Sequence, residues 1–331
     1  MPAAECAPGM RLCGLVLLLL ACAGAGASPL DRTAGATAGA SISAPHGSAN
    51  SAASAVTVTD DWGRRVTLTA RPGRIVSLAP HATESLVAAG ALERLVAVDP
   101  SSDHPPAVRS LPRVAAYPAP DLEALAALRP DLVIVWGAGA RASAIERIEA
   151  LGIRVFVSDP RRSADVSSTL KRLAQFSPSP AIALEAAREF DSTMARLRDR
   201  YRDAPAVPVF VQIGSHPLMT LNDRDSIGDA LRICGGRNVF AGVGTVAATV
   251  GPEAVLAAAP SLIVSTEAAG SREPWQSLGV LEPRGGLRIG WIGPAIHRPG
   301  PRFAALVEQL CGLIDEARSE RPGHVSARSL R

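Results

Sequence analysis

The sequence lacks the common catalytic motifs. Its 331 residues contain no G-x-S-x-G, H-E-x-x-H, Walker or C-x-x-C pattern, so no motif supplies an activated nucleophile, a zinc pair or a phosphate-binding loop. Ser215 and His216 are neighbours in the sequence, but a nucleophile and its base meet through tertiary geometry, which adjacency alone does not provide. We therefore assign no catalytic residues and expect a protein that is not an enzyme.

Strong net charge and long apolar runs are also missing. The net charge is +3 and the 34 basic residues are scattered, which excludes the basic patch expected of a nucleic-acid-binding protein. The apolar run at residues 12–21, after Arg11, is far shorter than the roughly 20 residues that span a bilayer. This pattern predicts an exported protein with a signal peptide at residues 1–27, either lipidated at Cys22 or cleaved after Ala27.

Cysteine is scarce, with five residues in the chain. Three of them, Cys6, Cys13 and Cys22, lie in or beside the leader, which leaves Cys234 and Cys311 in the exported body. Export permits a disulfide between these two. The alternative is two separate buried thiols, since free cysteine often behaves as a small hydrophobe.

The body of the chain divides into segments of different composition. Residues 28–55 are rich in Ala, Ser, Gly and Thr without apolar periodicity, which predicts a disordered tether. Two alternating segments around Gly63, at residues 56–59 and 66–69, predict a β-hairpin. Short apolar runs then alternate with helical patterns, which predicts a parallel sheet in an N-terminal α/β lobe, residues 56–177. The expected strands are 75–78, 95–98, 132–135 and 155–157, and the expected helices are 82–90, 121–128, 142–151 and 164–175.

A second series of the same kind predicts a C-terminal α/β lobe at residues 205–318. Its expected strands are 209–213, 262–264 and 288–291, and its expected helices are 226–234, 252–259 and 300–317. Between the lobes, residues 178–204 contain the segment Ala181 to Arg202, which has no Gly or Pro and predicts one long helix. We expect two Rossmann-like lobes with parallel sheets joined by this helix, a ligand cleft between them that changes little on binding, and a disordered tail at 319–331.

Aromatic residues make up only 4% of the chain, so an aromatic residue in a loop needs a reason. Trp136 follows an expected strand and precedes a Gly-Ala-Gly-Ala segment, at the carboxyl edge of a parallel sheet, where α/β proteins bind ligands. Tyr117 lies in a second such loop, before Pro118. The alternative is that both rings pack into the cores of their own loops.

Histidines follow several of the expected strands, at His81, His104, His216 and His297. No two of them have the i, i+4 spacing of a local metal site, and a site built from all four needs a carboxylate such as Asp103 or Glu84. The alternative, which is commoner in proteins, is that these histidines lie at the surface or cap helices. We assign no metal and no cofactor.

Ten segments of the sequence form a pattern that matches a known family. They are RIVSLAPHATE at 74–84, SDHP at 102–105, DLE at 121–123, LRPDLVIVW at 128–136, LGI at 151–153, PLMT at 217–220, CGGRNVF at 234–240, PEAVL at 252–256, RPGPR at 298–302 and LC at 310–311. Together they resemble the periplasmic cobalamin-binding receptors of ABC importers, over about residues 56 to 317. The pattern in the N-terminal lobe is shared with receptors for siderophores and haem, so it indicates the superfamily more than the ligand.

The resemblance implies a corrinoid bound between the lobes as transported ligand, with aromatic side chains against it. Tyr117 and Trp136 match pocket aromatics of the family, and Pro80 and His81 border the same cleft. The family often has tyrosine where this chain has Ser101, phenylalanine at Ile213 and Met219, a tryptophan near Ala247 and an acidic residue near Pro294, while its arginine remains as Arg298. The cysteine pair looks like the family's C-lobe disulfide, which implies a Cys234–Cys311 bond.

The resemblance also implies partners. Glu123 and Glu253 match surface carboxylates, one on each lobe, that meet arginines of the membrane permease, which works with an ATPase; without the resemblance, both read as glutamates favoured at helix N-termini. The protein is then a periplasmic monomer that meets the membrane only through a lipid anchor or the permease.

Two rival interpretations remain. One is a haem or siderophore receptor, in which Arg141, Arg224 and Arg298 meet ligand carboxylates and His216 and His297 ligate a bound metal centre. The other is a metal-dependent enzyme on a related bilobal fold, which needs a clustered ligand set.

Overall fold

The computed structural model describes residues 55–267, 271–281 and 286–319. The predicted signal peptide, the lipidation site at Cys22, the tether up to residue 54 and the tail beyond Ser319 lie outside the described residues. Within those three ranges, no helix combines the length and the apolar character needed to cross a membrane.

The N-terminal lobe is built on a parallel sheet whose strand order reverses direction at β3. An antiparallel hairpin precedes it, formed by β1 (Val56–Thr59) and β2 (Arg65–Leu68). The sheet order is β4-β3-β5-β6, with every pair parallel. Because the chain leaves β3 toward one neighbour and returns to the other, the carboxyl ends of β3 and β5 flank a topological switch point, where open α/β sheets bind ligands. The strands are β3 (Ile75–Leu78), β4 (Leu95–Val98), β5 (Leu132–Trp136) and β6 (Arg154–Ser158).

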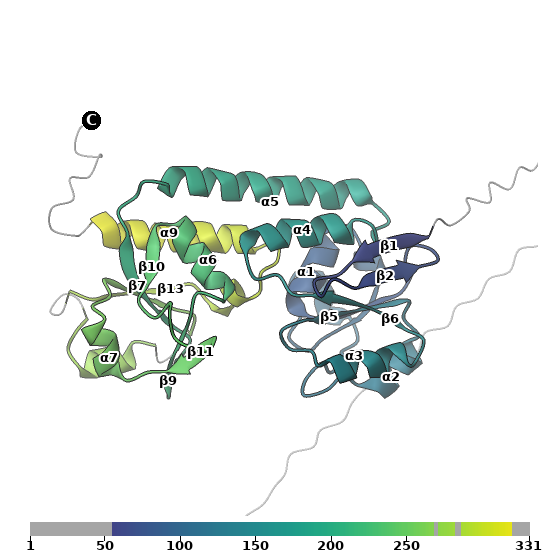
Figure 1. Cartoon of the computed structure of the whole chain (residues 1–331), viewed down its shortest axis with the longest axis horizontal. Coiled ribbons are helices and arrows are strands. Elements are labelled where there is room, and N and C mark those ends of the chain that lie inside the picture. Colours follow the sequence, from purple (N-terminus) through teal and green to yellow (C-terminus); the bar gives the residue numbers. More distant parts are fainter. Residues whose placement is uncertain (1–54, 268–270, 282–285, 320–331) are drawn as a thin grey trace, which may run out of the picture. The chain divides into compact units, whose positions relative to one another are not determined.

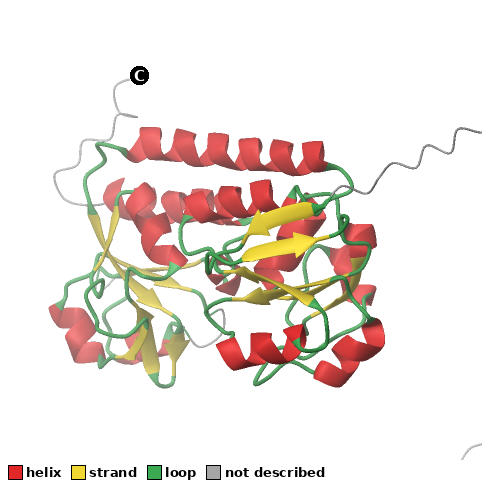
Figure 2. Cartoon of the chain, turned by 45° about the vertical axis from the view of Figure 1, so that its right-hand side comes forward, coloured by secondary structure: helices red, strands yellow, loops and turns green. Residues whose placement is uncertain are grey.

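Helices cover both faces of this sheet, as Figure 2 shows. Alternate strand residues point to opposite faces, so Ile75 and Ile134 pack in a core with Leu86 of α1, while Val133 packs with Leu125 of α2 on the other face. The helices are α1 (Pro80–Ala88), α2 (Leu122–Leu128), α3 (Ala142–Glu149) and α4 (Ser163–Leu173), with 3-10 turns η1 (Leu92–Arg94) and η2 (Pro106–Ser110).

A single long helix connects the two lobes, as the sequence predicts. Helix α5 (Pro180–Tyr201) has 22 residues and is therefore about 33 Å long at 1.5 Å per residue. Its buried residues include Phe190 and Met194, which pack in one core with residues of α4 and α9. Figure 1 shows α5 lying over α4 and α9, so this helix packs on helices of both lobes.

The C-terminal lobe repeats the strand order of the N-terminal lobe. Its parallel sheet runs β10-β7-β12-β13, so it has its own switch point between β7 and β12. The strands are β7 (Val207–Gln212), β10 (Gly236–Asn238), β12 (Leu262–Ser265) and β13 (Arg288–Trp291). The helices are α6 (Ser226–Ile233), α7 (Pro252–Ala257), α8 (Glu273–Ser277), the 3-10 turn η3 (Pro294–His297) and α9 (Phe303–Ser319).

A small antiparallel sheet of this lobe was not expected from the sequence. It has the order β11-β9-β8, from β8 (Gly214–Ser215), β9 (Leu218–Leu221) and β11 (Ala247–Thr249). These strands have two to four residues, which is too short for an alternating pattern to stand out.

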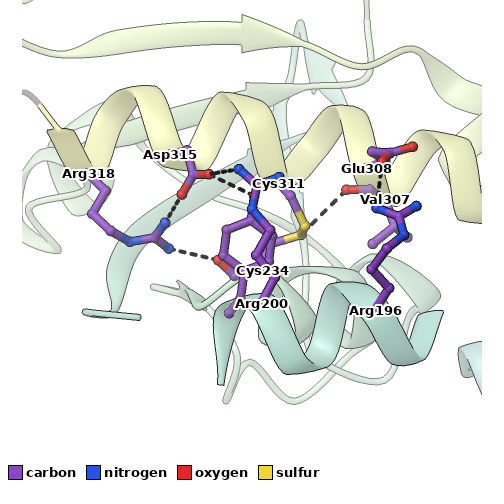
Figure 3. The surroundings of a disulfide bond; sticks show 9 residues. Arg196, Arg200, Cys234, Val307, Glu308, Cys311, Asp315 and Arg318 are labelled. Carbon is purple, nitrogen blue, oxygen red and sulfur yellow. Dashed lines mark hydrogen bonds and ion pairs between the residues drawn. A yellow bond between two sulfur atoms is a disulfide. The ribbon is translucent and has the colours of Figure 1, made fainter. Parts of the chain in front are cut away.

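The predicted Cys234–Cys311 disulfide is confirmed, with a sulfur–sulfur distance of 2.03 Å. It joins the end of α6 to α9, and both cysteines are buried. Figure 3 shows Arg318 beside it, paired with Asp315. Arg318 also donates to the carbonyl oxygen of Cys234 at 2.8 Å and to that of Pro205 at 2.9 Å. The bridge and this arginine fasten α9 to the lobe.

Most of the expected helices and strands begin and end within three residues of their predicted bounds. Strand β10 and helix α8 were not expected from the sequence, and β7 begins at Val207, two residues before the expected strand. Helix α1 begins at Pro80 rather than residue 82, because proline fits the first turn, where its missing N–H has no partner to lose. Helix α9 begins at Phe303 rather than residue 300 and continues to Ser319, one residue past the expected end of the lobe.

Candidate ligand-binding site

A cavity of about 590 Å³ lies at the switch point of the N-terminal lobe. Leu78 at the end of β3 and Val135 and Trp136 at the end of β5 line it, together with residues of η2–α2, α1 and α3. Its size is within the range of small-molecule sites. The cavity thus lies at the sheet edge where open α/β sheets bind ligands.

Flat and apolar side chains form one wall of this cavity. Trp136 is 44% exposed and Tyr117, in the loop before α2, is 86% exposed. Pro118 and Pro120 follow Tyr117 in the sequence and line the cavity with it. Large aromatic side chains left exposed at a concave surface are suited to bind a flat ligand, since burying them on binding is favourable.

His81 packs against the ring of Trp136. It lies in the first turn of α1, is 3% exposed, and its Nε2 is 3.0 Å from Oγ of Ser158. Burial lowers the pKa of His81 to about 4, because desolvation disfavours the imidazolium. The ring is thus neutral at pH 7, and it meets the Trp136 ring edge to face, with centroids 6.4 Å apart.

Three residues of the C-terminal lobe complete the cavity, Pro294, His297 and Arg298. His297 Nδ1 is 3.1 Å from Oδ1 of Asp225. Arg298 Nη1 is 2.9 Å from Oδ1 of Asp103, a residue of the N-terminal lobe. Desolvation acts to raise the pKa of Asp103, but the charge and hydrogen bond of Arg298 outweigh it and lower that pKa. The positive charge of Arg298 is therefore already matched.

Six of the eight predicted ligand residues line this one cavity. They are Pro80, His81, Ser101, Tyr117, Trp136 and Arg298. Ile213 and Met219 are outside its lining. Their backbones are hydrogen-bonded instead, since the Ile213 N–H donates to the carbonyl of Met219, in β9 of the small antiparallel sheet, at 3.0 Å.

Five polar residues of the lining were not expected there from the sequence, or were expected only for another ligand; His297 is one of them. Asp99, Ser143 and Arg147 line the cavity, and Arg141 was considered only for the haem alternative. The spacing of Ser143 and Arg147 places them on the same face of α3, but only the fold shows that this face borders the cavity.

The remaining histidines do not form a metal site in the described part of the chain. His216 is exposed and 3.2 Å from Oε2 of Glu273. His104 is outside the cavity lining. The described residues contain no group of three His, Cys, Asp or Glu side chains placed to hold a metal ion.

A second hollow of about 690 Å³ lies beside β1, α4 and α5. Most of the residues that line it are polar, including Thr57, Ser167 and Lys171, and Lys171 is paired with Asp191 at 2.8 Å. Because no aromatic residue lines it and its charges are paired, we place the ligand site at the switch point.

The two carboxylates expected to meet a permease lie in equivalent places. Glu123 is in the first turn of α2 and Glu253 in the first turn of α7, and both are exposed. The structure thus presents one glutamate at a helix N-terminus on each lobe, where the helix dipole favours negative charge.

Two parallel-sheet lobes, a long helix between them and an aromatic cavity at a switch point define a bilobal solute-binding protein. The sequence profile of the periplasmic binding protein family matches residues 75–274. The chain belongs to this family.

Its relatives include proteins with assigned ligands. The vitamin B12-binding protein of Photorhabdus laumondii is 34% identical over 255 residues, which cover 75% of this chain and 90% of that one. The crystal structure of the periplasmic vitamin B12 binding protein BtuF of Vibrio cholerae is 30% identical with a TM-score of 0.69, covering 76% of this chain and 99% of that one. A periplasmic haem-binding protein from Pseudomonas aeruginosa is 26% identical with a TM-score of 0.63, covering 74% of this chain and 93% of that one.

Proposed function

We propose that this protein is a periplasmic receptor that binds cobalamin or a related corrinoid and delivers it to an ABC permease of the inner membrane. The observation that carries the proposal is the cavity at the N-lobe switch point, with Trp136 and Tyr117 on its wall, in a chain 34% identical to a vitamin B12-binding protein. A corrin is a large, flat and largely apolar ring system, and exposed aromatic side chains can bury much of its surface without many hydrogen bonds.

Delivery requires no chemistry on the ligand. The protein then needs no cofactor and acts as a receptor rather than an enzyme. It is a monomer, it reaches the membrane through the permease or a lipid at Cys22, and Glu123 and Glu253 guide its docking. Exposed ion pairs of this kind are worth about 0 to 1 kcal/mol each, so they orient the encounter more than they tighten the complex.

A second candidate ligand is haem, because arginines line the same cavity and a haem-binding relative shares the fold. Arg141 and Arg298 line the cavity and are candidates to meet the propionates of haem, but Arg298 is already paired with Asp103. Arg224 is not part of the lining, and its guanidinium donates to the carbonyl of Gly244. Of the three arginines considered for this ligand, two therefore remain candidates.

The test is to titrate the purified protein with cyanocobalamin, dicyanocobinamide and haem in separate calorimetry runs, and to record the visible spectrum of each complex. Tight corrinoid binding without a change of axial ligand is the expected result. Haem binding with a shifted Soret band, and no corrinoid binding, would replace this proposal with the haem receptor.

A further inference from the structure

Two guanidinium groups on one wall of the cavity have no matching charge. Arg141 immediately precedes α3, Arg147 lies in its last turn, and both are exposed residues of the cavity lining. Neither guanidinium group takes part in an ion pair or hydrogen bond with another of the described residues. Arg298 on the opposite lobe differs, because Asp103 is 2.9 Å from it. Uncompensated positive charge is thus concentrated on the α3 wall.

The cavity offers no carboxylate to neutralise these arginines. Asp99 is the one carboxylate of its lining, and it is 4% exposed with both oxygens engaged. Oδ1 of Asp99 accepts from the N–H of Ser101 at 2.8 Å, and Oδ2 accepts from the hydroxyl of Ser102. The α3 wall is therefore left with donors, to which Ser143 adds a hydroxyl on the same helix face as Arg147.

We propose that Arg141, Ser143 and Arg147 form an anion subsite that binds an oxyanion of the ligand. This inference rests on the proposed function and specifies the chemistry of the same cavity. In cobalamin the oxyanion is the phosphodiester that links the corrin side chain to the nucleotide, and the carboxylates of haem offer the same chemistry. Guanidinium groups bind both kinds of oxyanion through charge-assisted hydrogen bonds, frequently in pairs.

The two walls then recognise different parts of one ligand. Trp136 and Tyr117 contact the flat ring system, whose surface is common to all corrinoids. The α3 wall contacts the phosphodiester, which cobinamide lacks. The subsite therefore selects the complete cobalamin over its cobinamide precursor, because leaving the arginines without an anion forgoes their strongest hydrogen bonds.

The experiment compares the wild type with the Arg141→Gln/Arg147→Gln double variant by calorimetry. Cyanocobalamin and dicyanocobinamide are the two probes. The control is Arg71→Gln/Arg154→Gln, which removes the same charge from two exposed arginines of the same lobe that lie outside the cavity lining. We expect the double variant to bind cyanocobalamin about 10-fold more weakly, the effect of roughly one charge-assisted hydrogen bond, and to bind dicyanocobinamide like the wild type.

Unchanged cyanocobalamin affinity in the double variant, or an equal loss for both probes, would overturn the subsite while leaving corrinoid binding by the wild type intact. Failure of the wild type to bind either corrinoid would instead overturn the proposed function. If the wild type binds haem, the same variants are titrated with haem and with haem dimethyl ester, whose carboxylates are blocked. A loss confined to free haem then supports the subsite, and equal affinities overturn it.

Discussion

The guanidinium of Arg302 donates two hydrogen bonds, of 2.8 and 2.6 Å, to the carboxylate of Glu84. Glu84 is in α1 of the N-terminal lobe, and Arg302 directly precedes α9 of the C-terminal lobe. The carboxylate side chain is 4% exposed and the guanidinium side chain 34% exposed. This pair joins the lobes away from α5, as does the Arg298–Asp103 pair, in which the carboxylate side chain is 64% exposed.

Breaking the pair should destabilise the protein unequally from its two ends. Arg302→Gln leaves a buried carboxylate without its cation and should lower the free energy of unfolding by about 3 kcal/mol. Glu84→Gln leaves a partly solvated arginine and should cost about 1 to 2 kcal/mol. Urea unfolding of both variants, and of the double Gln variant, measures these values. A double variant as unstable as the sum of the two would show that the groups do not interact.

His81 should make stability depend on pH. Burial lowers its pKa to about 4 from 6.5, so the unfolded chain binds more protons between these values and the free energy of unfolding falls as the pH drops through this window. From pH 7 to 4.5 the loss due to His81 is about 2 to 3 kcal/mol. His81→Gln should show a decrease smaller by that amount, with His104→Gln as control. If the free energy of unfolding of His81→Gln and of the wild type changed in parallel with pH, this role of His81 would be contradicted.

The disulfide should act on folding rather than on binding. Cys234 and Cys311 are 77 residues apart, and closing such a loop in the unfolded chain is worth about 4 kcal/mol in the chain-entropy model. The Cys234→Ala/Cys311→Ala variant should lose stability of that order in urea. Its affinity for the ligand at 25 °C should remain that of the wild type, since neither cysteine lines the cavity. Weaker binding by the folded variant would show that the bridge shapes the site.

The aromatic wall should dominate ligand affinity. Trp136→Ala and Tyr117→Ala should each weaken corrinoid binding by about 10- to 100-fold, the range of large aromatic side chains at the centre of binding sites. Trp291→Ala is a matched control, because Trp291 is 50% exposed yet outside the cavity lining. Calorimetry measures all three. An equal effect of Trp291→Ala would place the ligand elsewhere on the protein.

The docking carboxylates should affect transport alone. Glu123→Lys and Glu253→Lys should slow ligand uptake into cells severalfold while the purified proteins bind the ligand normally, because both side chains are exposed and outside the cavity. Charge reversal acts chiefly on the rate of encounter. The control is Glu189→Lys, at an exposed position on α5. Lost ligand affinity in either docking variant would assign it to binding instead.

The fold was predictable from local signals. Runs such as Leu132 to Val135 are uniformly apolar because their strands are covered on both faces. This pattern made the parallel sheets predictable from the sequence. The long helix was visible because Ala181 to Arg202 lacks Gly and Pro and proline residues precede and follow it. The sheet of β8, β9 and β11 was not predictable, because pairing between short segments distant in the sequence, such as Ala248 with Thr220, leaves no local pattern.

The site was predictable to the extent that it follows strand ends. Trp136 is the last residue of β5, and His81 lies at the start of the helix that follows β3, so their positions along the chain placed them at the cavity. Ile213 also follows a central strand, β7, but it belongs to the equivalent edge of the other lobe, and a sequence does not tell which edge is hollow. Arg147 is in the last turn of a helix, and only the packing of α3 against the sheet places it at the cavity.

Under the proposed function, the 22-residue helix α5 has a consequence for how a permease would recognise an occupied receptor. A continuous helix packed on both lobes acts as a strut, so empty and loaded receptors would have nearly the same outline. The empty and loaded receptors would then differ only in small features, such as whether the exposed Tyr117 is free or covered by the ligand. A permease reading such a receptor would sense the cargo and the loops beside it, rather than a change of shape.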